Sequence, residues 1–561
     1  MCETSPSEID WLAFGREDLR RCLTREEQEL LLTPHDISIA HNEAIECLRG
    51  GFWQGRSLTL PFSWDYSAQE SRAIPFRLQC FTWQACLMVE FFRTGDITCR
   101  DLLLAWVFDW IDAHPTVDRN DLSAWHDDAA GRRALFFGIF LIAFEKIMSD
   151  KQIGSLRKSL AMHAGLLRSE DFYRPFHNHG FYQDMALAVY ALSCGEDADY
   201  WSVLSAARTR VYLNAKISTE GVHLEHSPIY HFNIARGIAW LAVVFRSLDP
   251  DYAAELTGRL NKMAEYGQWI SLPNGALPSV GDSPREKTDM SIFACSAAAP
   301  GQMRVFPQAG YAFIRKDRDP GENSTWMMFL AATHGEVHKH NDDLSFLLYH
   351  GGGELFTEAG KRNYNYSEPE TEYCYSSYGH NVLFVNGVGW PMKPTGLPLL
   401  ERDAYATGIV AWEDTPTFSG VTGRQIRFPG VIQERTLCYD RQRELVTVED
   451  RITLESPATL KLIYHLAPDV TAERTDADTW TLFRGGVPAA SLSVAGNRPE
   501  LHASVTTESI LPWRTEIYWG DSSPRPGSLF SVELDGDTGL NILRLSIALH
   551  SCGESGCIIS K

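Results

Sequence analysis

Histidines gather in two parts of this sequence, and histidine is the side chain best suited to proton transfer and metal binding near neutral pH. Eleven of the 18 histidines lie in residues 161–240 and 331–380. Most of these eleven fall in three short segments, at residues 176–184, 221–232 and 334–346. These three segments therefore contain the candidate residues for chemistry, and the elements around them must hold these residues in place.

The first segment places Asn178 and His179 directly before an apolar run of helical spacing. Asparagine is a favoured helix cap, so one interpretation is a capped helix with partly exposed histidines. In a second interpretation, an amide and an imidazole at the positive end of the helix dipole form a small anion site that suits one carboxylate. The residues alone leave both interpretations open.

The second segment places Tyr230 close to a predicted helix start. Ser227 followed by Pro228 predicts this start, because serine is a favoured cap and proline is favoured at the first helical position. Tyr230 then lies in the first helical turn. A tyrosine at this position usually packs against the protein, and a role in chemistry is the alternative.

The third segment contains His338 and His340 in an H-x-H pattern. In an extended strand, residues i and i+2 share a face, so both rings are expected to point the same way. Further along the chain, Glu358 and His380 offer additional ligands that zinc accepts. Structural roles also remain open for these two residues, before a turn glycine and at the start of a strand.

The pattern of apolar residues changes near residue 300. Before it, they recur at helical spacing in segments at 76–92, 100–113, 132–148, 181–194, 200–215, 230–247 and 253–269. After it, short runs rich in β-branched and aromatic residues lie at 311–315, 325–331, 344–349, 381–385, 445–448 and 460–466. A run of helices followed by a run of strands predicts a helical domain at residues 1–300 and a two-layered antiparallel β-domain at residues 301–561.

The composition excludes several classes of protein. The 561 residues include 51 Lys and Arg against 72 Asp and Glu, and the resulting net charge of −21 repels nucleic acids. The longest apolar run, residues 134–144, is too short to cross a membrane, and the first residues show no signal peptide. The 12 cysteines include no C-x-x-C pair, as expected of reduced thiols. A soluble enzyme or binding protein remains, cytoplasmic as written, or periplasmic or secreted if a leader has been removed.

Taken in order, the three segments resemble the heparinase II/III-like polysaccharide lyases. The resemblance rests on N-H-G at 178–180, the segment at 221–231, H-K-H-N-D at 338–342, T-E-A-G at 357–360 and G-H-N-V-L-F-V-N-G at 379–387. It implies an N-terminal (α/α) toroid, a C-terminal antiparallel β-sandwich and a catalytic cleft between them. It also implies a carbon–oxygen lyase, which removes the C5 proton of a uronate and expels the C4 oxygen to leave an unsaturated end.

The resemblance implies roles for single residues as well. Asn178 and His179 would bind the substrate carboxylate, and Tyr230 and His338 would move protons. On a glucuronate one residue such as Tyr230 serves as base and then acid, whereas an iduronate needs a second group, for which His338 is the candidate. Both epimers therefore stay open. Four more residues are expected to contact the sugar or its neighbours: Arg174, Glu225, Tyr364 and Tyr366.

The same resemblance implies a metal site. His340, Glu358 and His380 would hold a divalent metal, zinc first, in a structural role that orders the loop carrying His338. Glu358 departs from the aspartate of many relatives, and its longer arm bears on ligand distance and on which metal binds. The metal would take no direct part in the reaction.

The resemblance also sets the expected substrate and its competitors. A glycosaminoglycan such as heparin, heparan sulfate, chondroitin or hyaluronan comes first, and alginate or a bacterial capsular uronan second. Because the protein is itself acidic, a locally basic cleft is expected. Self-association into a homo-oligomer is left open. The rival interpretations are a metal-dependent hydrolase using His338, His340 and Asp342, a glycoside hydrolase using Asp184 and Glu225, and a carbohydrate-binding protein without catalysis.

Overall fold

The computed structural model describes residues 41–53, 56–64, 73–194, 197–293, 301–316, 324–332, 334–335, 338–390, 407–498, 500–510, 512–520 and 523–550. The chain forms two compact units. The first contains Met1–Lys216 and Asn233–Leu260, and the second contains Ile217–Phe232 and Asn261–Lys561. The predicted boundary at residue 300 lies outside the described residues and stays a prediction. Two segments from the helical half of the sequence thus belong to the second unit.

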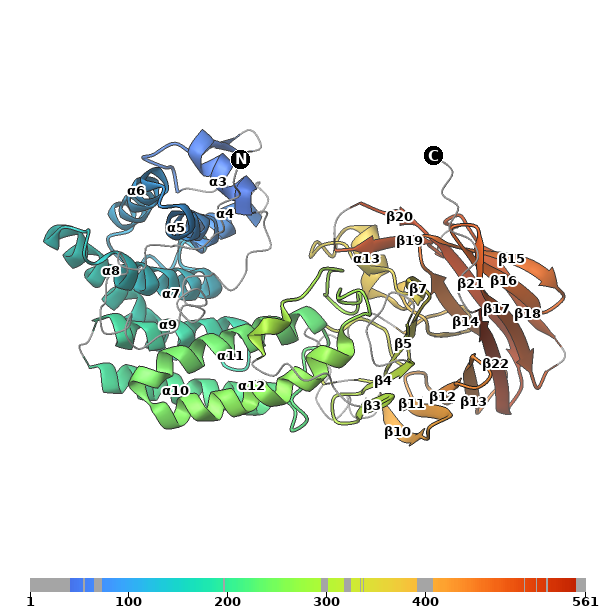
Figure 1. Cartoon of the computed structure of the whole chain (residues 1–561). Helices are drawn as coiled ribbons and strands as arrows, with labels where there is room; N and C mark the ends of the chain where they lie inside the picture. The colour runs from blue at the N-terminus through green and yellow to red at the C-terminus, as the bar shows by residue number, and fades with distance from the viewer. Residues whose placement is uncertain are drawn as a thin grey trace, which may run out of the picture. The chain divides into compact units, whose positions relative to one another are not determined.

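The first unit is helical, as the apolar periodicity predicts (Figure 1). Its helices are α3 (His41–Gly50), α4 (Ala73–Gln79), α5 (Thr82–Thr94), α6 (Ile97–Ala113), α7 (Asp127–Phe144), α8 (Asp150–Arg168), α9 (Asn178–Cys194) and α10 (Ala198–Lys216). It also contains most of α11 (Pro228–Leu248) and the first half of α12 (Pro250–Ile270), and a short hairpin formed by β1 (Phe52–Trp53) and β2 (Arg56–Ser57).

Two helices differ from the sequence prediction. The single helix predicted over 76–92 is broken into α4 and α5 at Phe81, whose backbone is left-handed (φ 61°). The fully buried Phe81 ring packs on Phe136 and Phe137, so tertiary packing decides this conformation. Helix α8 was not predicted, although a capping box between Ser149 and Gln152 marks its start.

Helices α7 and α9 lie against each other, and α9 begins at Asn178, one of the predicted site residues. They approach closely at Gly138, where a Cβ atom would lie 2.5 Å from the Val189 side chain. At the start of α9, a Cβ on Gly180 would lie 2.0 Å from the backbone oxygen of Arg174. The two glycines therefore allow α7, α9 and the loop before α9 to lie against one another.

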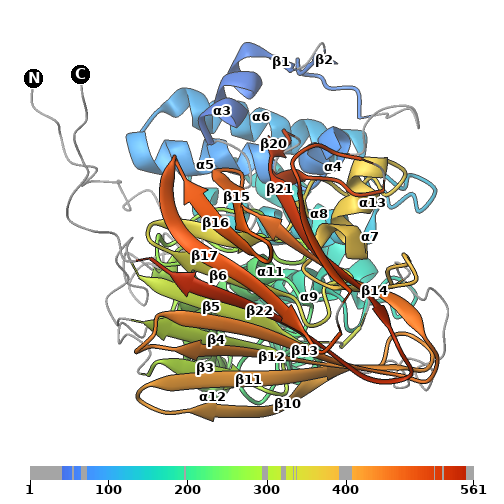
Figure 2. The same cartoon turned by 90° about the vertical axis from the view of Figure 1, so that its right-hand side faces the viewer.

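The second unit contains two large antiparallel sheets, which Figure 2 shows with the strands of the eight-stranded sheet side by side. The eight-stranded sheet has the order β10 (Thr407–Asp414), β11 (Phe418–Gln425), β12 (Val431–Asp440), β13 (Leu445–Leu454), β22 (Gly539–Leu549), β17 (Val487–Gly496), β16 (Thr479–Arg484) and β15 (Val470–Asp476). The nine-stranded sheet has the order β18 (Leu501–Thr506), β21 (Ser528–Gly536), β14 (Ala458–Leu466), β7 (Gly353–Thr357), β6 (Phe346–His350), β5 (Thr325–Leu330), β4 (Tyr311–Lys316) and β3 (Met303–Phe306), and β9 (Leu383–Val385) pairs with β14.

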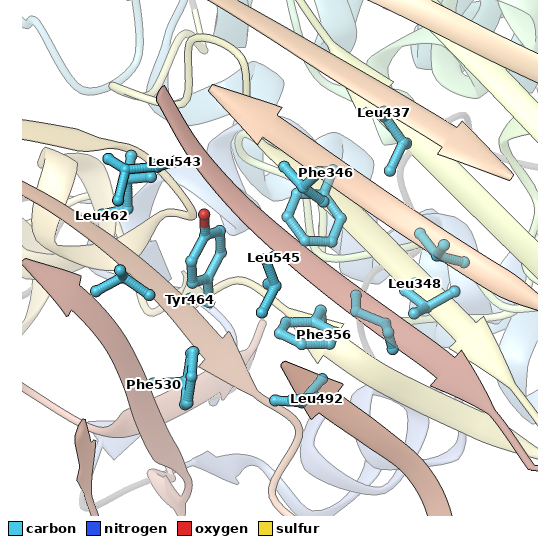
Figure 3. Close-up of a cluster of buried hydrophobic side chains, with 14 of the residues drawn as sticks. Phe346, Leu348, Phe356, Leu437, Leu462, Tyr464, Leu492, Phe530, Leu543 and Leu545 are labelled. Carbon is cyan, nitrogen blue, oxygen red and sulfur yellow. The ribbon is translucent and has the colours of Figure 1, made fainter. Parts of the chain in front are cut away.

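The inner faces of the two sheets share one apolar core. Phe346 and Phe356 from the nine-stranded sheet lie together with Leu437, Leu492 and Leu545 from the eight-stranded sheet (Figure 3). Strand β12 alternates strictly between buried and half-buried residues, as expected of a strand with one face on a core. The predicted architecture, a helical N-terminal region followed by an antiparallel β-sandwich, is confirmed.

Small elements complete the second unit near the candidate site. They are the three-stranded sheet of β20 (Arg525–Pro526), β19 (Glu516–Trp519) and β8 (Gly360–Lys361), helix α13 (Pro369–Tyr375), and the 3-10 turns η2 (Met290–Ile292) and η3 (Ser377–Gly379). Among the described residues, no helix combines the length and the hydropathy needed to cross a membrane.

Candidate functional site

The first group of predicted residues lies where α9 begins. Asn178 is the first residue of the helix, and the Nδ1 atom of His177 accepts a hydrogen bond from the backbone nitrogen of His179 at 3.2 Å. His177 therefore caps this helix end, and the interpretation of Asn178 as the cap is wrong. The half-buried Asn178 amide makes no side-chain hydrogen bond within the described residues, which leaves it available to a ligand.

His179 is held by a carboxylate at the start of α7. Its Nδ1 atom donates to Asp127 Oδ1 at 2.9 Å, and Asp127 Oδ2 accepts from the Nε atom of Arg174. Burial alone would raise the pKa of Asp127, but the hydrogen bonds from His179 and Arg174 outweigh it and hold this pKa well below its usual value. The Nε2 atom of His179 lies 3.8 Å from Asp128 Oδ2. Arg174, predicted to contact substrate, thus serves as the ionic partner of Asp127.

The second group lies in the second unit, where α11 begins as predicted. Ser283 Oγ accepts a hydrogen bond from the backbone nitrogen of Ile229 at 2.8 Å and lies 2.9 Å from Ser227 Oγ. Tyr230 follows in the first turn, and its ring stacks on the imidazole of His338 with centroids 3.6 Å apart and planes 19° from parallel. The helix start therefore brings the two predicted proton-transfer residues into direct contact.

His338 does not lie in a strand, and the strand predicted for the H-x-H pattern is wrong. The backbone of His338 is left-handed (φ 56°), and the next strand, β6, begins only at Phe346. A left-handed backbone costs a residue with a side chain roughly 1–2 kcal/mol. Because this conformation breaks the two-residue alternation, the shared direction of His338 and His340 must come from what they contact.

Both histidines contact one buried carboxylate, Asp282, which the sequence did not reveal. His338 Nδ1 donates to Asp282 Oδ2 at 2.5 Å, and His340 Nε2 donates to Oδ1 at 3.2 Å. The Tyr375 hydroxyl also donates to Oδ1. Burial alone would raise the pKa of Asp282, but the hydrogen bonds from His338 and His340 outweigh it and hold the pKa well below its usual value.

The residues predicted to bind sugar differ in exposure. Tyr364 and Tyr366 are 49% and 39% exposed, and Tyr364 Oη lies 3.0 Å from Tyr230 Oη. Tyr366 packs on the ring of Tyr375. Glu225 is buried, and its Oε2 atom lies 3.7 Å from His338 Nε2. The tyrosines are thus placed for a ligand, whereas the observed contact of Glu225 is with His338.

A separate buried group contains the predicted metal ligands Glu358 and His380, together with Asp342. One potential ligand atom of each lies within 4.8 Å of the other two. His340 is adjacent, since its ring centroid is 5.3 Å from that of His380. Asp342 was not predicted as a member of this set. The H-x-H-x-D pattern does point to Asp342 as a metal ligand, but as part of the metal-dependent hydrolase interpretation.

Unpartnered atoms test whether these residues fit a metal. Within the part of the chain that the structure describes, four buried atoms have no hydrogen-bond partner: His340 Nδ1, Asp342 Oδ2, Glu358 Oε2 and His380 Nε2. Burial opposes the charged form of His380, but the charge of Glu358, 3.2 Å away, outweighs it and raises the pKa of the histidine. Buried nitrogen and carboxylate oxygen atoms that face one another without partners suit a divalent cation such as zinc.

Two rival sites are not assembled. Asp184, proposed for a glycoside hydrolase, is fully buried in the first unit and accepts a hydrogen bond from Tyr173 Oη at 2.9 Å, so a sugar cannot reach it. The metal-dependent hydrolase would need His338 and Asp342 in one metal site. His338 instead donates to Asp282 and is not part of the buried group that contains Asp342. The structure thus joins Tyr230 to His338, and Glu358 to His380. Asn178 and His179 form their own group in the first unit, and their predicted convergence with Tyr230 stays a prediction.

Comparisons with known families place the chain in a defined class. The family described as "Heparinase II/III N-terminus" matches residues 53–310, and "Heparinase II/III-like, C-terminal" matches residues 298–512. The chain therefore belongs to the heparinase II/III-like family of polysaccharide lyases. No curated protein matches the sequence.

Solved structures agree in fold. A heparinase III crystal structure is 15% identical, with a TM-score of 0.72 and coverage of 98% of this chain and 87% of that one. Heparan sulfate lyase HepC from Pedobacter heparinus is 16% identical, with a TM-score of 0.66 and coverage of 97% and 86%. Chondroitin AC lyase from Streptomyces coelicolor A3 is 11% identical, with a TM-score of 0.50 and coverage of 93% and 82%. At these identities the likeness concerns the fold alone.

Proposed function

We propose that this protein is a catalytically active lyase that cleaves a uronate-containing polysaccharide by β-elimination. One observation carries the proposal: the Tyr230 ring lies directly on the His338 imidazole, at a helix mouth with exposed tyrosines beside it. A phenol and an imidazole in contact are two groups that can accept and return a proton. Their presence in a member of this family supports the full reaction over mere carbohydrate binding.

Removal of the C5 proton is the difficult step, because the neighbouring carboxylate is already negative. Asn178 and His179 are proposed to donate hydrogen bonds to the carboxylate oxygens as charge develops on them. A well-placed donor of this kind contributes about 3–4 kcal/mol to the transition state. The Asp127 carboxylate accepts the Nδ1–H of His179 and so orients the ring. His179 then donates to the substrate from Nε2–H, as the imidazolium.

Proton transfer is assigned to the second group. As the phenolate, Tyr230 takes the C5 proton, and the phenol so formed returns it to the C4 oxygen when both lie on one side of the sugar, as in glucuronate. His338 takes the proton from the opposite side in iduronate. The Tyr364 hydroxyl, 3.0 Å from that of Tyr230, is a hydrogen-bond partner for the phenol during this exchange.

A divalent metal, zinc first, is proposed to bind His340, Glu358 and His380, with Asp342 as a further ligand. When bound, it would neutralise the buried carboxylates and so stabilise the segment that carries His338. The proton steps themselves are performed by the side chains of this chain.

A glycosaminoglycan is proposed as the substrate, with alginate or a bacterial capsular uronan second. The ranking is supported by the similar structures, which are a heparinase III, a heparan sulfate lyase and a chondroitin AC lyase. Within the acidic protein, Arg174 and Lys361 supply positive charge beside the two groups. A metal-dependent hydrolase and a non-catalytic binding protein are the alternatives that the experiment must separate.

The test is a panel of heparin, heparan sulfate, chondroitin, hyaluronan and alginate, followed by ultraviolet absorbance of the unsaturated uronate. Lyase action gives absorbance that grows with time and is lost in Tyr230→Phe. Reducing ends without absorbance identify a hydrolase. Binding without any product identifies a carbohydrate-binding protein, and either of these results contradicts the proposal.

A further inference from the structure

One loop of the second unit, Gly281-Asp282-Ser283, contacts His338 and the start of the helix that carries Tyr230. Gly281 has a left-handed backbone (φ 53°), and a Cβ atom on it would lie 2.5 Å from the backbone oxygen of His226 and 2.9 Å from that of His338. Only glycine allows so close an approach. The glycine thus brings the loop directly under the segment that carries His338.

Asp282 is the acceptor for three donors, and an ionised carboxylate can only accept. The hydrogen between His338 and Asp282 must therefore lie on His338 Nδ1, 2.5 Å from Oδ2. The hydrogen between His340 and Asp282 must lie on His340 Nε2, 3.2 Å from Oδ1. The contacts of one carboxylate thus determine which nitrogen of each neutral ring keeps a free lone pair.

The free lone pairs of His338 and His340 suit different functions. For His338 the nitrogen that keeps its lone pair is Nε2, which lies 3.7 Å from Glu225 Oε2. For His340 the free nitrogen is Nδ1, which is buried and has no hydrogen-bond partner among the residues that the structure describes. That is the nitrogen a cation would need. A fixed tautomer therefore prepares one ring for proton transfer and the other for a metal.

We propose that Asp282 is a positioning residue that sets opposite tautomers on His338 and His340, and so joins the proton-transfer group to the metal group. Ser283 extends the same loop to Tyr230, since its hydroxyl accepts from the Ile229 backbone nitrogen at the helix start. The inference rests on the proposed lyase function for its purpose. The tautomers themselves can be measured whether or not the protein cleaves a polysaccharide.

The decisive measurement is solid-state 15N NMR of the full-length protein labelled at histidine, prepared without metal. Protonated and unprotonated ring nitrogens have well-separated shifts, and His338→Gln and His340→Gln assign the two rings. We expect Nδ1–H for His338 and Nε2–H for His340 in the wild type. Asp282→Asn should give a mixture of both tautomers for His338. The opposite wild-type tautomer for either ring overturns the proposal, and this readout needs no variant of Asp282 to fold.

Two further variants serve as controls for Asp282→Asn. Glu354→Gln removes another buried carboxylate, which pairs with Arg285 and touches neither histidine, so both tautomers should persist. Ser283→Ala removes the hydrogen bond at the helix start and should also leave the tautomers unchanged. If Asp282→Asn behaves like Glu354→Gln, the carboxylate has no positioning role.

Zinc binding gives a second readout. Titration of the metal-free protein with zinc alone, followed by calorimetry, should show an affinity 10–100-fold lower in Asp282→Asn than in the wild type. An unchanged affinity, or no zinc binding by the wild type, overturns the link to the metal group. A protein that shows the expected tautomers but forms no unsaturated product from any polymer would refute the proposed lyase function and leave the role of Asp282 standing.

Discussion

Each unit of the molecule holds one histidine against one aspartate, and the two pairs differ chiefly in burial. In the first unit, Asp127 holds His179 at a helix start, and the two side chains are 13% and 27% exposed. In the second, Asp282 holds His338, with exposures of 1% and 14%. Besides His179, Asp127 pairs with Arg174 and lies 3.2 Å from His126 Nδ1, whereas Asp282 also accepts from His340 and Tyr375. The histidine–aspartate pair of the first unit is therefore partly exposed and freer to move, whereas the pair of the second unit is buried and held in one orientation.

The difference follows from the chemistry proposed for each pair. A histidine that receives a substrate carboxylate must be reached by a charged polymer, so its support lies near the surface. A histidine that moves protons needs a defined ring orientation and tautomer, which a buried carboxylate enforces. Five predictions test this contrast, from the largest expected effect to the smallest.

Tyr230→Phe should have the largest effect, because it removes the hydroxyl of the tyrosine whose ring stacks on His338. We expect kcat to fall by about 10³-fold or more, with KM changed little, since a general acid–base group contributes up to about 10⁴-fold. Steady-state kinetics by ultraviolet absorbance measures this change. Tyr364→Phe is the matched control and should cost less than about 10-fold. Equal losses in the two variants would contradict the assignment of Tyr230.

Asp282→Asn should destabilise the protein more than Asp127→Asn. Removing one partner from a buried charged group costs about 3–5 kcal/mol, and the cost falls toward about 1 kcal/mol as exposure increases. Scanning calorimetry of the two variants against the wild type gives the comparison as a difference in Tm. If both variants lower the Tm equally, burial does not distinguish the two pairs.

Asn178→Ala should lower kcat by about 10²-fold while KM changes by less than about threefold. The reason is that its amide is proposed to meet charge that develops only in the transition state, a contribution of about 3 kcal/mol. Asn120→Ala, an exposed asparagine of the same unit, serves as the control. A rise in KM with unchanged kcat would instead show that Asn178 binds the ground state and the transition state equally.

The pH dependence of stability should report Asp127. Because its pKa is lowered in the folded protein, its contribution is complete above the unfolded-state pKa of about 3.9 and is lost as the pH falls below that value. The difference in Tm between wild type and Asp127→Asn should therefore be full at pH 5 and shrink toward pH 3. A difference that grows on acidification would have the wrong sign.

Salt should have the smallest effect and should act on one pair only. The Debye length falls from about 10 Å at 0.1 M to about 3 Å at 1 M, and buried charges are screened much less than exposed ones. The loss of kcat/KM in Asp127→Asn should therefore shrink by a few-fold in high salt. The loss in Asp282→Asn should stay constant. Parallel salt responses would remove the distinction between the two pairs.

The sequence predicted the fold well because the helical spacing of apolar residues before residue 300 differs clearly from the short β-branched and aromatic runs after it. Helices α6, α9, α10, α11 and α12 begin and end within about three residues of their predicted segments. The errors have physical causes. At Phe81 a buried aromatic ring forces a left-handed backbone inside an apolar run that is otherwise helical.

Site residues that lie in a recognisable sequence motif could be predicted, whereas those outside such motifs could not. Tyr230 was found because Ser227 and Pro228 mark a helix start. Asp282 was missed because it is a single aspartate in a loop, and only the folded chain brings it to His338, 56 residues away. Asp127 was missed for a related reason, since an acidic residue at a helix start already has an ordinary electrostatic explanation.

The adjacency of Asp282 and Ser283 limits how this loop can change in evolution. The two neighbouring residues face different partners, an imidazole and a helix start, and there is no room for a Cβ atom at Gly281. Inserting or deleting one residue here would redirect both side chains at once. The length of this loop is therefore more constrained than its composition, and a duplicated gene that altered the length would lose the proposed reaction in a single step.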